Sequence, residues 1–258
     1  MSNLTLIRIP NYNFMINTSS FIDKLLPYET DLFFALNGSG SLFWDNAMWT
    51  YTGLVIWLPM ILFILYFAFR NQQLKQGMLV LGAIVLVLLL SSLISGSLFK
   101  PFFKRYRPSH HPDYHHLVAI VNGFKGGDYG FISGHATNSF GLAFFLSLLY
   151  RNQLVTISLM LWATLNSYSR IYLGVHFISD IVAGFVIGAI IGLLVYKIYT
   201  KVRPSFYDMS HSHEKGTIYT QKQGNLLGVV IFLYIAFVII FSPFLSSFSH
   251  TIIPEAWF

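Results

Sequence analysis

Six long runs of apolar residues constrain this chain more than any other feature. One helical crossing of a bilayer takes about 20 consecutive, mostly apolar residues. Runs of roughly this length occupy residues 51–69, 78–99, 136–150, 154–168, 177–199 and 226–248. Only 10% of the residues are charged, against about 25% in a soluble globular chain, which disfavours a soluble bundle of buried helices. We therefore predict an all-α, polytopic membrane protein with six transmembrane helices, the third and fourth being the shortest.

The stretch before the first run is of a different kind. Residues 21–36 mix acidic and basic side chains with leucine and phenylalanine, and are too charged to span a bilayer. This composition predicts an amphipathic helix lying at the membrane interface, followed by a loop over residues 37–41 in which Gly38 and Gly40 favour a turn. The residues before it lack the pattern of a secretory signal. With no linker in view, we expect a single membrane domain, 1–258, whose N-terminal interfacial segment is 1–50.

Basic residues indicate the orientation of the chain. They gather in the three links that an even number of spans places on one side, namely Arg70, Lys75, Arg151, Lys197, Lys201, Arg203, Lys215 and Lys222. The positive-inside rule makes that side cytoplasmic, so both termini and the loop 100–135 are expected outside. The net charge of +6 suits anionic lipid head groups and does not indicate nucleic acid. The absence of cysteine excludes disulfides and thiolate-bound metal.

An ionisable cluster stands in the otherwise apolar stretch SRIYLGVHFISD, residues 169–180. If the chain is helical from Val175 onward, His176 and Asp180 share a face and the carboxylate can accept a hydrogen bond from the ring. A histidine held in this way is a better nucleophile or base. Arg170 adds a fork of donors suited to phosphate oxygens. A polar network that only stabilises the start of a helix is the alternative interpretation.

Two further clusters are expected on the same outer side. In FISGHATN, Ser133 and Gly134 lead into a helix whose free amide groups can hold an anion, with His135 beside it. The segment KPFFKRYRP places basic residues where the positive-inside rule disfavours them, which suggests either a functional role or an anchor for lipid head groups. Its basic members are Lys100, Lys104, Arg105 and Arg107. Cationic donors with two histidines and a carboxylate suit phosphoryl transfer.

These three pieces resemble the signature of the type 2 phosphatidic acid phosphatase superfamily. The first motif, lysine, six residues, then Arg-Pro, matches Lys100 to Arg107-Pro108. The second, normally Pro-Ser-Gly-His, matches residues 132–135, with Ile132 where proline is usual. The third matches Ser169, Arg170, His176 and Asp180. The resemblance covers a catalytic core of residues 95–185, and Ile132 affects a turn and no reacting atom.

The resemblance implies a role for each matched residue. His176 attacks phosphorus to form a phosphohistidine, Asp180 supports it, and His135 protonates the leaving group and then activates water. Phosphate is bound by Lys100, Arg107, Ser133, Gly134 and Arg170. The family uses no metal and no cofactor.

The resemblance also implies a membrane lipid substrate, presented by the bilayer to a site on the periplasmic side of a bacterial inner membrane. The candidates are undecaprenyl pyrophosphate, phosphatidylglycerophosphate, phosphatidic acid and the phosphates of lipid A. We expect no obligate protein partner.

Several alternatives stay open. A lipid phosphotransferase would use the same phosphohistidine, a vanadate-dependent haloperoxidase the same pocket, and a non-enzymatic transporter none of this chemistry. The histidines of SHHPDYHHL, residues 109–117, form either a substrate-contacting loop, plain surface, or, with Asp113, a zinc site of unusual spacing. Lys125 and Asp128 belong to a glycine-rich loop that is either a lid or simply solvated. We assign nothing to His211 and His213.

Overall fold

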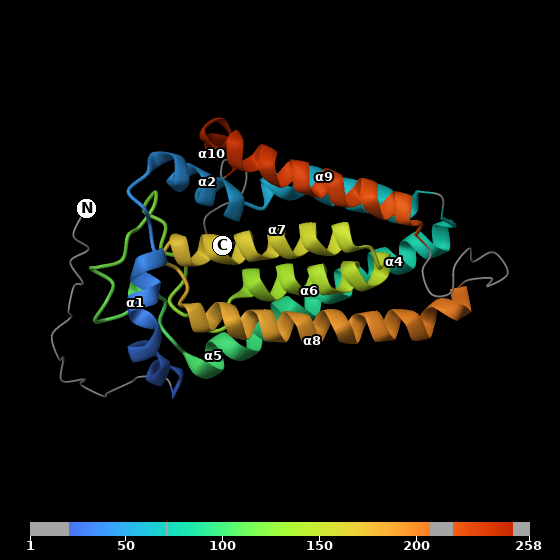
Figure 1. The fold of residues 1–258 in the computed structure, drawn as a ribbon. Coiled ribbons are helices and arrows are strands. Elements are labelled where there is room, and N and C mark those ends of the chain that lie inside the picture. The colour runs from blue at the N-terminus through green and yellow to red at the C-terminus, as the bar shows by residue number, and fades with distance from the viewer. Residues whose placement is uncertain (1–20, 71, 207–218, 250–258) are drawn as a thin grey trace.

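The fold is a bundle of helices (Figure 1). The computed structural model describes residues 21–70, 72–206 and 219–249, and within these ranges it contains helices, loops and one isolated bridge between Tyr106 and Tyr129. The predicted all-α class is confirmed. The N-terminal stretch without a signal pattern, together with Lys215, His211 and His213, lies outside the described residues.

The longer helices of the described chain follow the long axis of the bundle (Figure 1). They are α3 (Leu58–Phe69), α4 (Leu74–Ser92), α6 (Gly134–Tyr150), α7 (Gln153–Tyr172), α8 (Ile178–Val202) and α9 (Gln221–Ile240). The α3–α4 and α6–α7 turns and the last turn of α8 lie at one end, and α1 lies at the other. The basic residues of the described links, such as Arg70, Arg151 and Arg203, are therefore at the opposite end of the bundle from the ionisable motifs, as the sequence predicted.

The predicted count of six spans is not confirmed. Among the residues that the structure describes, three helices are long and apolar enough to cross a membrane: Leu74–Phe103, Ile178–Val202 and Gln221–Ile240. The first of these joins α4 to a π-helical segment, η3 (Leu93–Phe99), and to α5 (Lys100–Phe103). A fourth span results if α2 (Leu42–Thr52) and residues Val55–Phe69, bent by 72° against each other, count as one.

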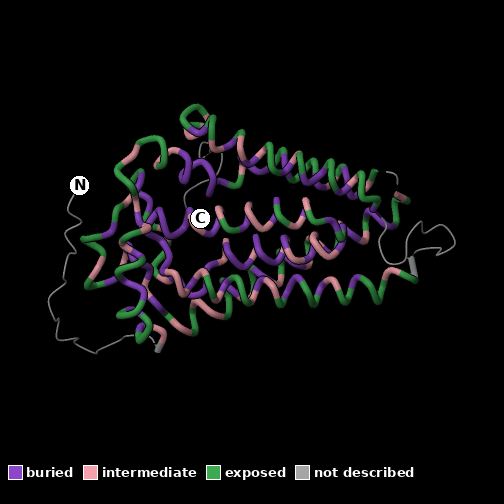
Figure 2. Tube along the Cα trace, viewed as in Figure 1, coloured by how far each residue is buried: buried purple, intermediate pink, exposed green. Residues whose placement is uncertain are grey.

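The differences from the prediction have physical reasons. Helix α6, with 17 residues, is about 25 Å long and so shorter than the hydrocarbon core of about 30 Å. Helix α7 is longer but buries polar side chains such as Ser158, Asn166 and Ser167 among its neighbours. Figure 2 shows how much more of α6 and α7 is buried than of α8. The run 51–69 breaks at Gly53, and the run 226–248 ends at Ile240, followed by the separate helix α10 (Ser242–Ser249).

The N-terminal segment is helical where the sequence predicted, in η1 (Phe21–Leu25) and α1 (Leu26–Leu36), and the predicted loop follows. Its buried side is mixed, since Asp23 and Glu29 are buried together with Leu26 and Phe33, and its exposed side carries apolar Leu32 beside charged Asp31. The position of this helix at a membrane interface stays a prediction.

Helices α6 and α8 pack with their backbones in close contact. Three glycines spaced by four residues on α8, Gly184, Gly188 and Gly192, face α6. A Cβ atom on Gly188 would lie only 2.6 Å from the carbonyl oxygen of Thr137. Because the first turns of these helices carry His135 and Asp180, this contact fixes the two residues relative to each other.

We expect Gly188→Ala to destabilise the protein by about 1–3 kcal/mol, because the added methyl group forces the α6 and α8 backbones apart. Gly82→Ala on α4 is the matched control: its Cβ meets nothing within 4 Å and alanine favours the helix. Thermal unfolding in detergent measures both variants. Equal unfolding temperatures for the two variants would show that the close α6–α8 contact does not contribute to stability.

Candidate active site

The predicted site residues converge on one cavity at the α1 end of the bundle. The cavity has a volume of about 230 Å³ and is lined by Ser92, Ser95, Gly96, Lys100, Arg107, Gly134, His135, Asn138, Arg170 and His176. Six of the eight predicted residues are in this lining. The other two, Ser133 and Asp180, are fully buried behind it.

Different helices contribute the lining residues. Lys100 is at the end of the long α4–η3–α5 helix, whose π-helical segment brings Ser95 and Gly96 to the cavity. Segments of this kind within α-helices often occur at functional sites. His135 is in the first turn of α6, and Arg170 is in the last turn of α7.

His176 and Asp180 are in the predicted contact, with His176 Nδ1 3.1 Å from Asp180 Oδ2. The helix begins later than expected, at Ile178, with Val175 and His176 still in the loop. The contact forms because Asp180 is in the first turn of α8 and its Oδ2 also accepts a hydrogen bond from the amide of Phe177, at 3.1 Å. With the ring proton on Nδ1, the lone pair is on Nε2, which faces Arg107.

The surroundings of His176 favour its neutral form. Burial is the main cause that lowers its pKa well below the usual value, and the charges of Arg107, Arg170 and Lys100 add to this effect. A neutral imidazole with a free Nε2 is a nucleophile, whereas an imidazolium is not.

Two arginines provide the donors next to His176. Arg107 Nη1 lies 3.4 Å from His176 Nε2 and donates to the carbonyl of Val175 at 3.3 Å. Burial lowers the pKa of Arg107 to about 10, which leaves it charged at neutral pH. Arg170 is fully buried, bonds to Thr52 Oγ1 and lies 5.4 Å from the Phe124 ring centre. Within the described part of the chain, the Nε atoms of both arginines have no hydrogen-bond partner, so donors remain for an anion.

Ser133 and Gly134 begin α6, as the sequence predicted. The Ser133 hydroxyl accepts a hydrogen bond from the amide of Ala136 at 3.4 Å and thereby caps the helix. Its own amide donates to the carbonyl of Asp180 at 3.1 Å and is not free for an anion. Gly134 does line the cavity. The assignment of Ser133 to phosphate binding stays a prediction.

Arg105, assigned only to a basic cluster from the sequence, is the main support of the site. It is fully buried, and its guanidinium contacts Asp180 Oδ1 at 2.7 Å, Glu29 Oε1 at 2.6 Å and Asp23 Oδ1 at 3.2 Å. Glu29 also accepts hydrogen bonds from the amide and the hydroxyl of Ser179, at 2.7 and 2.8 Å. The signal in the sequence was an unexplained arginine together with acidic residues in an otherwise apolar N-terminal helix.

The glycine-rich loop 122–130 packs against the site. A Cβ atom on Gly130 would lie 3.0 Å from Asp180 Oδ2 and 3.4 Å from His176 Nδ1, so the loop approaches as closely as it does because this residue is glycine. The carbonyl of Asp128 accepts a hydrogen bond from the Arg107 amide, and that of Lys125 accepts one from Ser109. These contacts give the loop a structural role on the site, whereas motion as a lid stays untested.

The histidine-rich loop presents no metal site in the part of the chain that the structure describes, where no group of three or more histidine and acidic side chains is arranged around a common centre. His111 is buried and stacks on Tyr114, with ring centres 4.7 Å apart. His115 Nδ1 lies 3.0 Å from the carbonyl of His111, and His116 is exposed.

Comparisons with known proteins identify the family of this chain. Residues 78–204 match the PAP2 superfamily. The chain is 40% identical over 204 residues to a lipid A 4'-phosphatase of Porphyromonas gingivalis, covering 77% of this chain and 84% of that protein. It is 43% identical over 182 residues to a lipid A 4'-phosphatase of Bacteroides thetaiotaomicron, covering 70% and 81%. The crystal structure of Aquifex aeolicus LpxE superposes with a TM-score of 0.51 at 27% identity, covering 66% of this chain and 95% of that one.

This chain belongs to the PAP2 superfamily. The predicted class, a phosphatase associated with membranes, is thereby confirmed.

We expect Glu29→Ala to lower the free energy of unfolding by about 1.5–3 kcal/mol, because charged hydrogen bonds to Arg105 are lost and donors of Ser179 stay buried without a partner. Asp31→Ala on the same helix, where the side chain is exposed, is expected to change it by no more than about 0.5 kcal/mol. Thermal unfolding in detergent compares the two. A Glu29 variant as stable as the Asp31 variant would contradict the supporting role of the network.

Proposed function

We propose that this membrane lipid phosphatase removes the 4'-phosphate of lipid A through a phosphohistidine on His176. The observation that carries the proposal is the His176 ring, held by Asp180 with Nε2 turned toward a cavity that three cationic side chains line. The two relatives named as lipid A 4'-phosphatases, at 40% and 43% identity, favour lipid A over the other lipid phosphates considered.

The first chemical step forms the bond between His176 Nε2 and phosphorus. The bond from phosphorus to the sugar oxygen breaks, and His135 donates a proton to that oxygen. Burial and the nearby cations lower the pKa of His135, so it carries this proton only when the bound phosphate dianion offsets their charge. The Nδ1 proton stays in the hydrogen bond to Asp180, whose carboxylate stabilises the positive charge that develops on the ring.

The second step returns the enzyme to its starting state. His135, now neutral, takes a proton from a water molecule, and the oxygen of that water attacks phosphorus. The bond from phosphorus to Nε2 breaks, inorganic phosphate leaves, and His176 becomes neutral again. Lys100, Arg107 and Arg170 neutralise the equatorial oxygens in both steps, in a buried setting where such contacts are stronger than in water.

The position of the basic links supports a periplasmic site. Arg70, Arg151 and Arg203 all follow helix ends at the far end of the bundle from the cavity. The positive-inside rule assigns that end to the cytoplasm, so the cavity faces the periplasm of a bacterial inner membrane.

The first test measures phosphate release by the detergent-purified protein from lipid A carrying phosphate at both the 1- and 4'-positions, with EDTA present. We expect loss of the 4'-phosphate alone, unaffected by EDTA, and a fall of at least about 10³-fold in His176→Ala, because no other group replaces the nucleophile.

His116→Ala, which changes an exposed histidine, is the matched control and is expected to keep full activity. Release of the 1-phosphate instead would contradict the proposed substrate position. Transfer of phosphate to another lipid without free phosphate would identify a phosphotransferase. Activity that survives in His176→Ala would contradict the nucleophile.

A second prediction concerns protonation. Because burial and three cations lower the pKa of His176, its ring is expected to be neutral at pH 6.5, where an unperturbed histidine is half charged. The test is ¹⁵N NMR of histidine-labelled protein between about pH 5 and 8, with the His176 resonance assigned from its loss in His176→Ala. A titration midpoint at or above 6.5 would contradict the proposed neutral nucleophile.

A further inference from the structure

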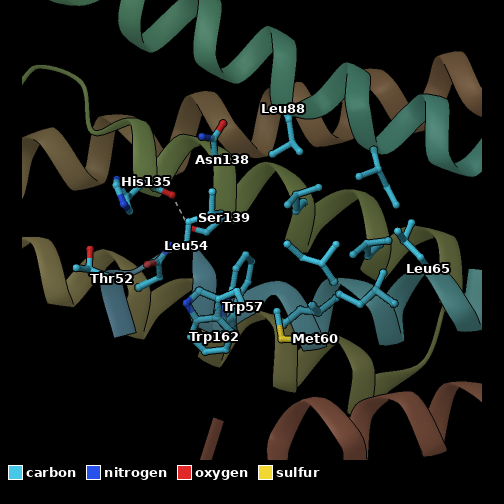
Figure 3. A pocket seen from close by; sticks show the side chains of 17 residues that line it. Thr52, Leu54, Trp57, Met60, Leu65, Leu88, His135, Asn138, Ser139 and Trp162 are labelled. Atoms are coloured by element: carbon cyan, nitrogen blue, oxygen red, sulfur yellow. Dashed lines mark hydrogen bonds between the residues drawn. The ribbon is translucent and has the colours of Figure 1, made fainter. Parts of the chain in front are cut away.

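A second cavity adjoins the catalytic one and is almost entirely apolar. It has a volume of about 390 Å³ and lies between α3, α4, α6 and α7 (Figure 3). His135 and Asn138 line both cavities, so the apolar space lies next to the residue proposed to protonate the leaving group. In Figure 3 these two residues are at one end and Leu65 is near the other.

The length of this cavity matches one leaflet of a bilayer. Its lining runs along α6 from His135 to Leu146, a distance of about 16 Å at the rise of an α-helix. Half of a hydrocarbon core is about 15 Å thick. An occupant that begins at the catalytic site and fills the cavity is therefore as long as one acyl chain.

The cavity opens toward the lipid side of the bundle. Phe69 at the end of α3 packs directly against Gly77 of α4, which closes the two helices at their turn. Farther from the turn, Ile61 of α3 and Leu88 of α4 both line the cavity and are both exposed, by 38% and 36%. At this level, α3 and α4 therefore carry side chains that both line the cavity and reach the outside of the bundle.

Two polar atoms in the lining lack a partner within the described residues. They are Asn138 Oδ1, an acceptor, and Trp162 Nε1, a donor, and both are buried. An acyl chain joined to its head group by an amide or ester, with a hydroxyl or N–H nearby, supplies one group of each kind. A plain hydrocarbon supplies neither.

We propose that this cavity binds one acyl chain of the lipid whose phosphate lies in the catalytic cavity, and that the chain reaches it between α3 and α4. The inference rests on the proposed function, because it takes a phosphorylated lipid as the substrate. Leu142, which lines the cavity at mid-length on α6, is in contact with the chain.

The test compares lipid A with its deacylated disaccharide bisphosphate, which keeps the phosphate and lacks the chains. Leu142→Trp narrows the cavity, and Leu148→Trp, also half-buried on α6 but outside both linings, is the matched control. We expect Leu142→Trp to reduce the kcat/KM for lipid A relative to that for the disaccharide by at least about tenfold, as for two displaced methylene groups. Leu148→Trp leaves this ratio as in the wild type.

If the ratio of kcat/KM for lipid A to kcat/KM for the disaccharide is the same in both variants, the inference is overturned, whereas the proposed phosphatase activity still holds. If neither substrate is hydrolysed by the wild type, the proposed function fails, and the cavity is tested directly with a brominated alkyl phosphate. Bromine in the cavity quenches the fluorescence of Trp57 and Trp162, which line it. We expect this quenching to fall when both residues are replaced by phenylalanine, and also when unbrominated alkyl phosphate is added as a competitor. Quenching that persists in both cases overturns the inference, and this measurement also decides the question if Leu142→Trp does not fold.

Discussion

One buried guanidinium supports the rest of the site. Arg105 contacts carboxylates from three places in the chain: Asp23 in η1, Glu29 in α1 and Asp180 in α8. A buried guanidinium without its carboxylate partners would strongly destabilise the fold. The positions of η1, α1 and the start of α8 therefore depend on one another. Because Asp180 also holds the His176 ring, the N-terminal segment is part of the support of the nucleophile.

The burial that makes this network necessary also shapes the chemistry. A low-dielectric setting strengthens the attraction of Lys100, Arg107 and Arg170 for a phosphate, and it keeps the pKa of His176 low. The same setting makes the three cations repel one another. The carboxylate of Asp180 is turned away, toward Arg105 and the far side of the imidazole. A phosphate dianion therefore relieves a repulsion that the fold itself imposes.

The sequence predicted the helical class and the convergence of Arg107, His135 and His176, because motif spacing is a local property and transfers from the family. It could not predict which apolar runs face lipid, since lipid and protein interiors select the same residues. For this reason the sequence did not show that α6 and α7 are more buried than α8. Nor could it predict the Arg105 network, whose partners are separated by 75 to 82 residues. The apolar cavity depends on the arrangement of α3, α4, α6 and α7 relative to one another, and this cannot be predicted from any one apolar run of the sequence.

The glycine contact between α6 and α8 makes this pair of helices more rigid than α3 and α4. At Gly188 the backbones of α8 and α6 are in direct contact, which restricts the sliding of these two helices past each other. Helices α3 and α4 are in close contact at their turn, but farther along they line the apolar cavity, where side chains have room to repack. Motion that admits a lipid is therefore expected from α3 and α4 and not from the α6–α8 pair. The spacing between His135 and Asp180, which the α6–α8 contact sets, would then stay the same while a lipid enters or leaves.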